Sequence, residues 1–369
     1  MESPSHLTSG KPINQGIAFG LGWLRFTCNE EFREELMKWL AENLGVEFID
    51  RERGWNGYLK SWSGSGGILV ASTPRMSHVQ REELGLKKSP NEGKVTVDIP
   101  QSVLDGCNLK FHSVIWFKLL SIDSVKFNRI DIYCDDYKKR ISPQELEKRI
   151  IDGSVGVPRV EQIKSWSKTS LRHSKSIGHT VYLGSEKSDK QVRYYDKFSE
   201  SEGKQDCYRF EVQFVRAKAA AWKEVMLSAL EKSLDCESES ETANCVAAVY
   251  KSVLVGEVDF IDLSKGNQLG KQSANWASRG ERCEWWKEIV ANIEKWRLVV
   301  NRSKPSLAKG ISWFKKQVVP LLSIVRTAYR HWQIPWNEWI FNQLEEGEER
   351  WSDRHWQILK EALVDYPAV

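Results

Sequence analysis

Three segments in the middle of the chain alternate apolar with polar residues, and this pattern restricts the possible folds more than any other feature of the sequence. The segments span residues 128–135, 191–197 and 208–214. A repeat of two is typical of a β-strand, because successive side chains point to opposite faces of a sheet. The pattern therefore predicts three strands, each with one buried face and one polar face.

Helical patterns surround these strands and indicate the fold class. Ser142, Pro143 and Glu145 form the start signal of a helix, which Gly153 would end. Residues 17–28 are predicted to form an opening strand. This order of strands and helices predicts an α+β fold in which helices pack on one face of a mainly antiparallel sheet.

The length of the chain predicts more than one structured part. A chain of 369 residues exceeds the usual size of a single domain. After the alternating strands, the sequence is rich in helix formers that are interrupted by single Gly and Pro residues. We expect a flexible tail over residues 1–16, a sheet-containing domain over residues 17–262 and an α-helical, partly basic domain over residues 263–369.

Charged residues are unevenly distributed in the C-terminal third of the chain. Residues 265–330 contain fourteen Lys or Arg and four Glu, whereas residues 331–369 contain three basic and eight acidic residues. The basic stretch predicts a polyanionic partner. Five of the 17 Trp residues fall in the same stretch. They would either form the core of the helical domain or accompany contacts to phosphates.

The sequence argues against membrane-spanning, secreted, disulfide-stabilised and zinc-finger proteins. It has no run of about 18 apolar residues, as a membrane span requires, and its N-terminus lacks the pattern of a signal peptide. We therefore expect a cytoplasmic protein without a membrane partner. The seven Cys residues are odd in number and form no C-x-x-C pair, which argues against a disulfide framework and a zinc finger.

The polar faces of the three strands carry the residue types that phosphodiester transfer requires. If the strands pair in one sheet, one surface gathers Arg129, Asp131, Asp135, Arg193, Tyr195, Lys197, Arg209 and Glu211. Carboxylates can hold a divalent cation, cations can stabilise charge on phosphorus, and a phenol can act as the nucleophile. The alternative is an exposed sheet face that carries only cross-strand ion pairs.

Three phrases of the sequence resemble a known family. They are NRIDIYCDD at 128–136, GHTVYLGSEKSDKQVRYYDK at 178–197 and YRFEVQF at 208–214. In this order they closely resemble the three motifs of the replication initiation factor family, whose members serve small rolling-circle plasmids, filamentous phages and conjugative elements. The resemblance implies a core similar to that of the HUH nickases, which is RRM-like.

The resemblance also implies a catalytic role for Tyr195, and two cations of the same strand are expected to assist it. The tyrosine of the family's R-x-Y-D-K phrase cleaves the DNA strand, and it corresponds to Tyr195 here. Arg193 and Lys197 flank it on the same face. A phenol with a pKa of about 10 is a poor nucleophile at neutral pH, so we expect a metal, Arg193 or Lys197 to favour the phenolate. Tyr194 alternates onto the other face and is expected to be a core residue.

We expect Mg²⁺ or Mn²⁺ as the cofactor, held by Asp131, Glu211 and Asp135. Related HUH nickases hold their cation with a His-hydrophobe-His pair, which this chain lacks. His179 alone is expected near the active face. Asp196 should point to the buried side of its strand.

Residues 159–175 are predicted to form a basic loop that grips single-stranded DNA, where an aromatic ring can stack on an unpaired base. A solvated connector is the alternative. The candidate DNA-binding residues are Arg159, Lys164, Trp166, Lys168, Arg172 and Lys175.

The resemblance implies a rolling-circle initiator that nicks and rejoins origin DNA through a 5′-phosphotyrosine. Its expected partners are origin DNA, single-stranded at the nick and duplex for recognition, together with a host helicase and polymerase. The sequence leaves open whether the protein forms a homodimer. The rival interpretation is a non-catalytic, sequence-specific DNA-binding regulator that uses the sheet only to dock DNA.

Overall fold

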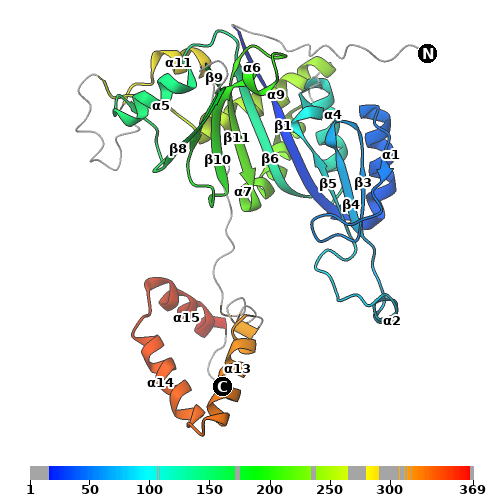
Figure 1. Ribbon diagram of the computed structural model, residues 1–369, viewed down its shortest axis with the longest axis vertical. Helices are drawn as coiled ribbons and strands as arrows, with labels where there is room; N and C mark the ends of the chain where they lie inside the picture. Colours follow the sequence, from blue (N-terminus) through cyan, green and yellow to red (C-terminus); the bar gives the residue numbers. More distant parts are fainter. Residues whose placement is uncertain are drawn as a thin grey trace. The chain divides into compact units, whose positions relative to one another are not determined.

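The computed structural model describes residues 16–105, 107, 109–170, 175–233, 238–264, 280–290, 307, 311, 314–315 and 317–365. The chain divides into two compact units, residues 1–300 and 301–369, and each is described by itself. The first unit contains a large antiparallel sheet with helices, and the second consists of helices (Figure 1). The predicted α+β class is confirmed.

The first unit is built on a ten-stranded sheet. Its strands are β1 Ile17–Asn29, β2 Ile49–Asp50, β3 Lys60–Ser63, β4 Leu69–Thr73, β5 Lys94–Ile99, β6 Lys126–Asp136, β8 Ile163–Ser170, β9 Lys175–Leu183, β10 Lys190–Asp196 and β11 Tyr208–Val215. They lie in the order β2-β3-β4-β5-β1-β6-β11-β10-β9-β8, and all neighbours pair antiparallel. The three alternating segments therefore belong to adjacent strands at the centre of the sheet.

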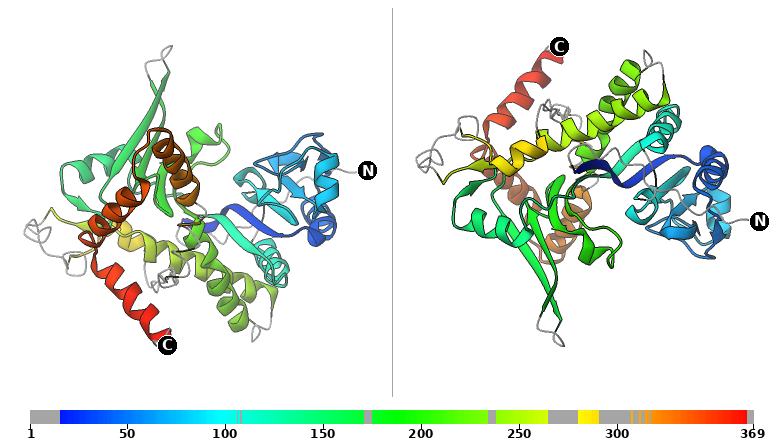
Figure 2. Two further views of the ribbon diagram at one scale, coloured as in Figure 1. Left: turned by 90° about the horizontal axis from the view of Figure 1, so that it is seen from below. Right: turned by 90° about the horizontal axis from the view of Figure 1, so that it is seen from above.

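The helices of this unit are mostly short. They are α1 Arg33–Leu44, α2 His78–Glu83, α3 Gln101–Leu104, α4 Leu109–Leu120, α5 Pro143–Ile151, α6 Lys197–Glu200, α7 Arg216–Ala220, α8 Trp222–Ser233 and α9 Glu239–Glu257, with 3₁₀ turns η1 Glu30–Phe32 and η2 Ser65–Gly67. Helices α4, α8 and α9 contact one another and form a layer on one side of the sheet (Figure 2). The opposite side of the central strands carries the polar residues.

Aromatic side chains fill the layer between these helices and the sheet. Trp116 of α4 stacks on Trp222 of α8, with ring centroids 6.2 Å apart, and lies 5.1 Å from Phe127 of β6. The indole nitrogen of Trp116 donates a hydrogen bond of 2.6 Å to the hydroxyl of Tyr250 in α9. Buried polar atoms need such partners, so this bond also fixes how the two helices pack.

The predicted alternation of the central strands is confirmed. Ile130, Ile132, Phe210, Val212 and Phe214 are fully buried in the core. The residues between them point to the polar face, as the period of two requires.

The prediction of a loop over residues 159–175 is wrong for residues 163–170 and for Lys175, which lie in strands. Residues 163–170 form β8, an edge strand that pairs with β9. Ile, Trp and Thr favour strands in general, and β9 supplies backbone partners that the sequence pattern alone did not reveal. The β8–β9 hairpin extends from the sheet on the side opposite α8 and α9 (Figure 2).

The compact units do not divide at the expected boundary near Asp262. Strand β12, Ile261–Asp262, pairs with β7, Val155–Gly156, and α11, Glu284–Val290, follows in the same unit. Trp286 of α11 is fully buried, and its indole nitrogen donates to Asp259 Oδ1 at 2.8 Å. Residues beyond 262 therefore complete the core of the sheet unit, and the division falls between residues 300 and 301.

Three helices of the second unit have described bounds: α13 Val319–His331, α14 Trp336–Glu348 and α15 Asp353–Asp365. Aromatic contacts join α13 to α14, since the Tyr329 ring lies 5.3 Å from the Trp339 ring. Of the five Trp residues in the basic stretch, Trp276, Trp296 and Trp313 lie outside the described residues, whereas Trp285 and Trp286 pack in the core. No helix in the described part of the chain is long and apolar enough to span a membrane.

Candidate active site

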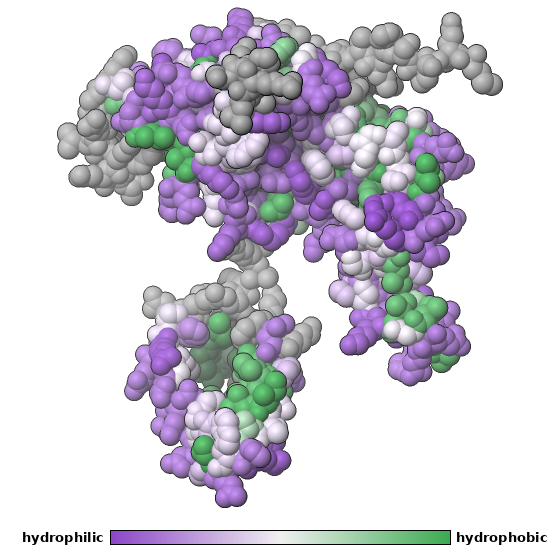
Figure 3. Space-filling view, in the orientation of Figure 1, coloured by the Kyte–Doolittle hydropathy of each residue, from purple (hydrophilic) through white to green (hydrophobic). Residues whose placement is uncertain are grey.

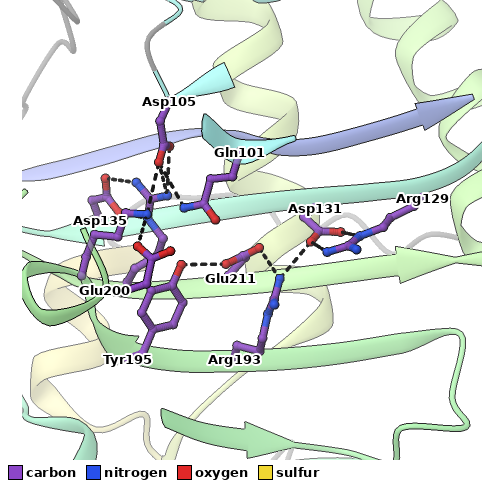
Figure 4. A network of polar contacts seen from close by, with 11 residues as sticks. Gln101, Asp105, Arg129, Asp131, Asp135, Arg193, Tyr195, Glu200 and Glu211 are labelled. Carbon is purple, nitrogen blue, oxygen red and sulfur yellow. Dashed lines mark hydrogen bonds and ion pairs between the residues drawn. The ribbon is translucent and has the colours of Figure 1, made fainter. Parts of the chain in front are cut away.

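The polar faces of β6, β10 and β11 form one surface, as predicted. Tyr195 of β10 lies opposite Arg209 of β11, and Arg209 lies opposite Asp135 of β6. The next row of the sheet contains Arg193 and Glu211. Figure 3 looks onto this face and shows mainly hydrophilic side chains over the middle strands, and Figure 4 shows the contacts among them.

Tyr195 points its hydroxyl at a carboxylate. The hydroxyl donates a hydrogen bond of 2.9 Å to Glu211 Oε2, and the tyrosine is only 7% exposed. Burial, followed by the negative charge of Glu211, raises the pKa of Tyr195 well above its usual value. The phenol therefore keeps its proton in this structure, with an acceptor already in place.

Arg193 connects two carboxylates beside the tyrosine. Its Nη2 donates to Asp131 Oδ2 at 2.9 Å and to Glu211 Oε1 at 2.5 Å. Arg129 also binds Asp131, through Nε at 2.9 Å and Nη2 at 2.6 Å. Burial raises the pKa of Asp131 to about 7. The hydrogen bond from Arg129 lowers this pKa, and the negative charge of Glu211 raises it.

A second cluster lies on the other side of Tyr195. The buried Arg209 donates to Asp135 at 2.5 and 2.9 Å and to Asp105 at 2.9 and 3.1 Å. Lys197 Nζ lies 3.3 Å from Asp105 and 2.5 Å from Glu200. Burial alone would raise the pKa of Asp105, but the charges of Arg209 and Lys197 lower it.

We expected a metal, Arg193 or Lys197 to favour the phenolate of Tyr195. In this structure Arg193 and Lys197 both form ion pairs with acids, and the role of a metal stays a prediction. The pKa of Tyr195 is raised because burial penalises the charged form and Glu211 repels it.

Sequence analysis missed two residues that lie over this face. Gln101 and Asp105, at α3 and directly after it, are joined by a hydrogen bond of 3.1 Å and lie near Tyr195 (Figure 4). They lie about ninety positions before Tyr195 in the chain and belong to no alternating strand. Only the packing of α3 on β1 brings them to the site.

Residues 125–334, more than half of the chain, match the family described as replication initiation factor. The chain belongs to the replication initiation factor family. The resemblance inferred from the three sequence phrases is thus confirmed.

Two known proteins are similar to this family member. NicK of Bacillus subtilis (strain 168), which is classed as a DNA relaxase, is 22% identical over 213 residues. That match covers 56% of this chain and 54% of NicK, so the chain spans about half the length of that relative. The solved structure of a rolling circle replication initiator protein from Geobacillus stearothermophilus matches with a TM-score of 0.52 and 18% identity, over 78% of this chain and all of the other. At 18% identity, this match shows a shared fold.

In this replication initiation factor, the three expected metal ligands do not come together. Asp131 and Glu211 are neighbours through Arg193, but Asp135 is held by Arg209 in the second cluster. In the described part of the chain, no group of three or more His, Cys, Asp or Glu side chains could hold a metal ion. The protein offers a pair of carboxylates, not the expected set of three.

Two other expectations concern residues near the motif strands. Asp196, expected to point to the buried side of its strand, is partly buried and accepts a hydrogen bond of 3.0 Å from the backbone of Phe198 as the N-cap of α6. His179 does not lie near the active face, because Thr180 is the residue paired with Tyr195. His179 instead contacts Glu147 at 2.8 Å on the opposite side.

The β8 strand brings three candidate DNA-binding residues of this family member to the face of Tyr195. Trp166 and Tyr195 both pair with Thr180, so Trp166 lies in the same row, two strands away. Lys164 and Lys168 alternate onto the same face. Trp166 is 56% exposed, which leaves its ring available for stacking.

The other three candidates are not part of this group. Arg159 precedes β8 and donates to the backbone oxygen of Gly256 at 2.9 Å, so it ties the chain to the end of α9. Lys175 begins β9, and its side chain is not described. Arg172 lies outside the described residues.

Proposed function

We propose that this protein is a rolling-circle replication initiator that nicks and rejoins origin DNA with Tyr195 as the nucleophile. The hydrogen bond from the Tyr195 hydroxyl to Glu211 carries the proposal, because it joins a family-motif phenol to a proton acceptor. Arg193 contacts the same carboxylate. The family and the similar structure support the role in replication initiation.

The proposed reaction is a transesterification. The Tyr195 oxygen attacks phosphorus as its proton passes to Glu211, and the bond from phosphorus to the 3′ oxygen breaks. The 3′ oxygen takes up a proton and becomes the 3′-OH end, while the 5′ phosphate stays on the tyrosine. The reverse attack by a 3′-OH rejoins the strand and returns the proton to the phenol.

Cations around the tyrosine would stabilise the extra negative charge on phosphorus. Arg193 is partly exposed beside Glu211, so a phosphate oxygen can reach its guanidinium group. Lys197 is buried behind Asp105, and it would act on the phosphate only after Asp105 moves.

We also propose that Mg²⁺ or Mn²⁺ assists this reaction. Asp131 and Glu211 would hold the ion, with oxygens of the DNA and water as the remaining ligands. The ion would supply a Lewis acid next to the phosphate. The two carboxylates suit a metal ion because they already share one positively charged group. Nη2 of Arg193 bonds both of them.

The proposed substrate is a single strand at the nick site. Trp166, in the row of Tyr195, would stack on an unpaired base, and Lys164 and Lys168 would contact phosphates. The free 3′-OH would prime a host polymerase. A host helicase would unwind the duplex, since the sequence has no phosphate-binding loop of the GxxxxGK[ST] type.

One observation favours the rival role of a non-catalytic DNA-binding regulator. Tyr195 is almost completely buried, and its pKa is raised. A regulator would bind origin DNA equally well with phenylalanine at this position and would form no covalent product.

The experiment that tests the proposed function is a search for a covalent adduct. The purified protein is incubated with labelled single-stranded oligonucleotides tiled from the replicon that carries its gene. We expect one oligonucleotide to yield a protein–DNA band that resists denaturation, with mass spectrometry placing the DNA on Tyr195. Absence of an adduct with every oligonucleotide, in protein that binds the origin, would support the regulator instead.

A further inference from the structure

The polar face continues beyond the candidate site onto the N-terminal half of the sheet. Trp23 and Arg25 of β1 alternate onto this face, since Trp23 pairs with Asp131 and Arg25 with Arg129. Gly22 lies between Trp23 and the site, and a Cβ added there would lie 3.7 Å from Glu211 Oε1. Glycine at this position adds no side chain to the space next to Glu211.

Two guanidinium groups on this half stack on tryptophan rings. The guanidinium carbon of Arg129 lies 4.1 Å from the centre of the Trp23 ring, and that of Arg25 lies 5.2 Å from the Trp55 ring. Asp98 of β5 fixes the arrangement. It accepts a bond of 2.6 Å from the Trp23 indole and two of 2.8 Å from Arg25.

The charges along this face are layered. The side chains of Arg25, Arg129 and Arg193 are 28%, 19% and 25% exposed, whereas those of Asp98, Asp131 and Glu211 are 10%, 0% and 2% exposed. Arg25 and Arg129 bind their carboxylates through Nε and Nη2, which leaves Nη1 on the far side of each planar group. The face therefore presents guanidinium groups to solvent with the acids beneath them.

Flat rings and outward guanidinium groups are what a single strand of nucleic acid requires. Bases stack on indole rings, and phosphates accept hydrogen bonds from arginine. A duplex offers no free base faces along its side, so this chemistry favours an unpaired strand.

We propose that Trp23, Arg25, Trp55 and Arg129 form a second contact region for single-stranded DNA, on the opposite side of Tyr195 from Trp166. This inference rests on the proposed function and adds the path of the strand. From β8 to β1 the sheet has five strand spacings, or about 24 Å. If the bases stay stacked as in a duplex, at about 3.4 Å per nucleotide, that distance corresponds to roughly seven nucleotides.

The same contacts also hold β5, β1 and β6 together, so the test needs a control for that structural role. The other side of the sheet unit offers one. The guanidinium carbon of Arg33 lies 5.0 Å from the ring of Trp62, a partly buried residue packed against the hydrophobic core. Arg33→Gln therefore removes the same kind of stacked pair away from the proposed strand path.

The experiment measures binding of the full-length protein to a fluorescent oligo(dT) of roughly 20 nucleotides at one fixed salt concentration. We expect Trp23→Leu, Arg25→Gln and Trp55→Leu each to weaken affinity at least about fivefold, and Arg33→Gln to bind as wild type. Trp23→Phe keeps a flat ring and should lose less affinity than Trp23→Leu. Circular dichroism shows that each variant is folded.

Two results would overturn the proposal. One is wild-type affinity in folded Trp23→Leu, Arg25→Gln and Trp55→Leu while Trp166→Leu binds weakly. The other is a loss of affinity for duplex DNA alone, which would make this half of the face a duplex contact. Binding is measured without cleavage, so the result does not depend on whether Tyr195 is the nucleophile.

Discussion

Tyr194 and Tyr195 are adjacent in the sequence but have opposite surroundings. Tyr194 is fully buried on the helix side, where its ring stacks on Phe210 at 3.8 Å and its hydroxyl donates to the backbone oxygen of Ile141. Tyr195 lies on the polar face against Glu211. The period of a strand alone separates a packing residue from a candidate nucleophile.

We predict that Tyr195→Phe abolishes DNA cleavage and adduct formation, because it removes only the attacking oxygen. Tyr194→Phe is the matched control. It loses one buried hydrogen bond, which should lower the free energy of unfolding by about 1 kcal/mol, and it should still cleave. Gel analysis of cleavage and thermal unfolding measure the two effects. Cleavage by Tyr195→Phe but not by Tyr194→Phe would exclude Tyr195 as the nucleophile.

We predict that the acidic residues of the two clusters respond differently to amide substitution. Glu211→Gln should reduce the cleavage rate by about a hundredfold or more, because the amide neither accepts the proton nor binds a hard cation well. Asp131→Asn should raise the Mg²⁺ or Mn²⁺ concentration needed for cleavage. Asp135→Asn should mainly lower stability, since Asp135 pairs with buried Arg209.

Cleavage assays over a range of metal concentrations, and in excess chelator, check this prediction. Activity of the wild type in chelator would exclude the metal. An unchanged metal requirement in Asp131→Asn would remove that residue as a ligand.

At the scale of elements, the C-terminal end of α9 is fixed to the sheet by one buried acid. Glu257 accepts a bond of 2.6 Å from Lys218 and lies 3.2 Å from Lys190 of β10. Burial alone would raise the pKa of Glu257, but the charges of the two lysines lower it. This acid therefore links α9 to the strand that carries Tyr195.

We predict that Glu257→Gln lowers the free energy of unfolding at pH 7 by roughly 2 kcal/mol or more. Because the folded pKa of Glu257 is lowered, its contribution is fully present above the unfolded pKa of about 4.3 and is lost as pH falls through the folded pKa. The difference from wild type should therefore shrink in acid. Urea unfolding at several pH values measures it.

The matched control for this prediction is Glu224→Gln, which changes an exposed acid on α8. Its free energy of unfolding should match that of wild type at every pH. A difference between Glu257→Gln and wild type that stays constant down to pH values below the folded pKa would contradict the linkage.

At the scale of the whole molecule, the two compact units carry different parts of the charge. Residues 301–330 contain seven Lys or Arg and no Asp or Glu, and they belong to the second unit. Residues 281–290, with buried Cys283, Trp286 and Ile289, belong to the first. The position of a truncation therefore decides whether charge or core is removed.

We predict that a chain ending at Val300 keeps the cooperative unfolding of the sheet unit but binds duplex DNA more weakly, with a smaller dependence on salt. A chain ending at Asp262 should be destabilised by about 3 kcal/mol or more, because it loses Trp286 from the core. Thermal unfolding and binding titrations at several salt concentrations measure both effects. Equal duplex affinity and salt dependence in the full chain and the chain ending at Val300 would show that the basic residues of the second unit do not contact DNA.

The sequence by itself determined the central strands, the faces of Tyr194 and Tyr195, and the family. A period of two and the order of three motifs are local properties, and local sequence carries them. The tertiary structure determined the contacts between distant segments, which no local pattern predicts. Asp105, directly after the distant helix α3, binds Arg209 beside Tyr195, residues 163–170 form a strand because β9 offers backbone partners, and Trp286 joins the sheet core across the expected boundary. Each of these depends on contacts between segments far apart in the chain, and burial in those contacts also raises the pKa of the Tyr195 phenol.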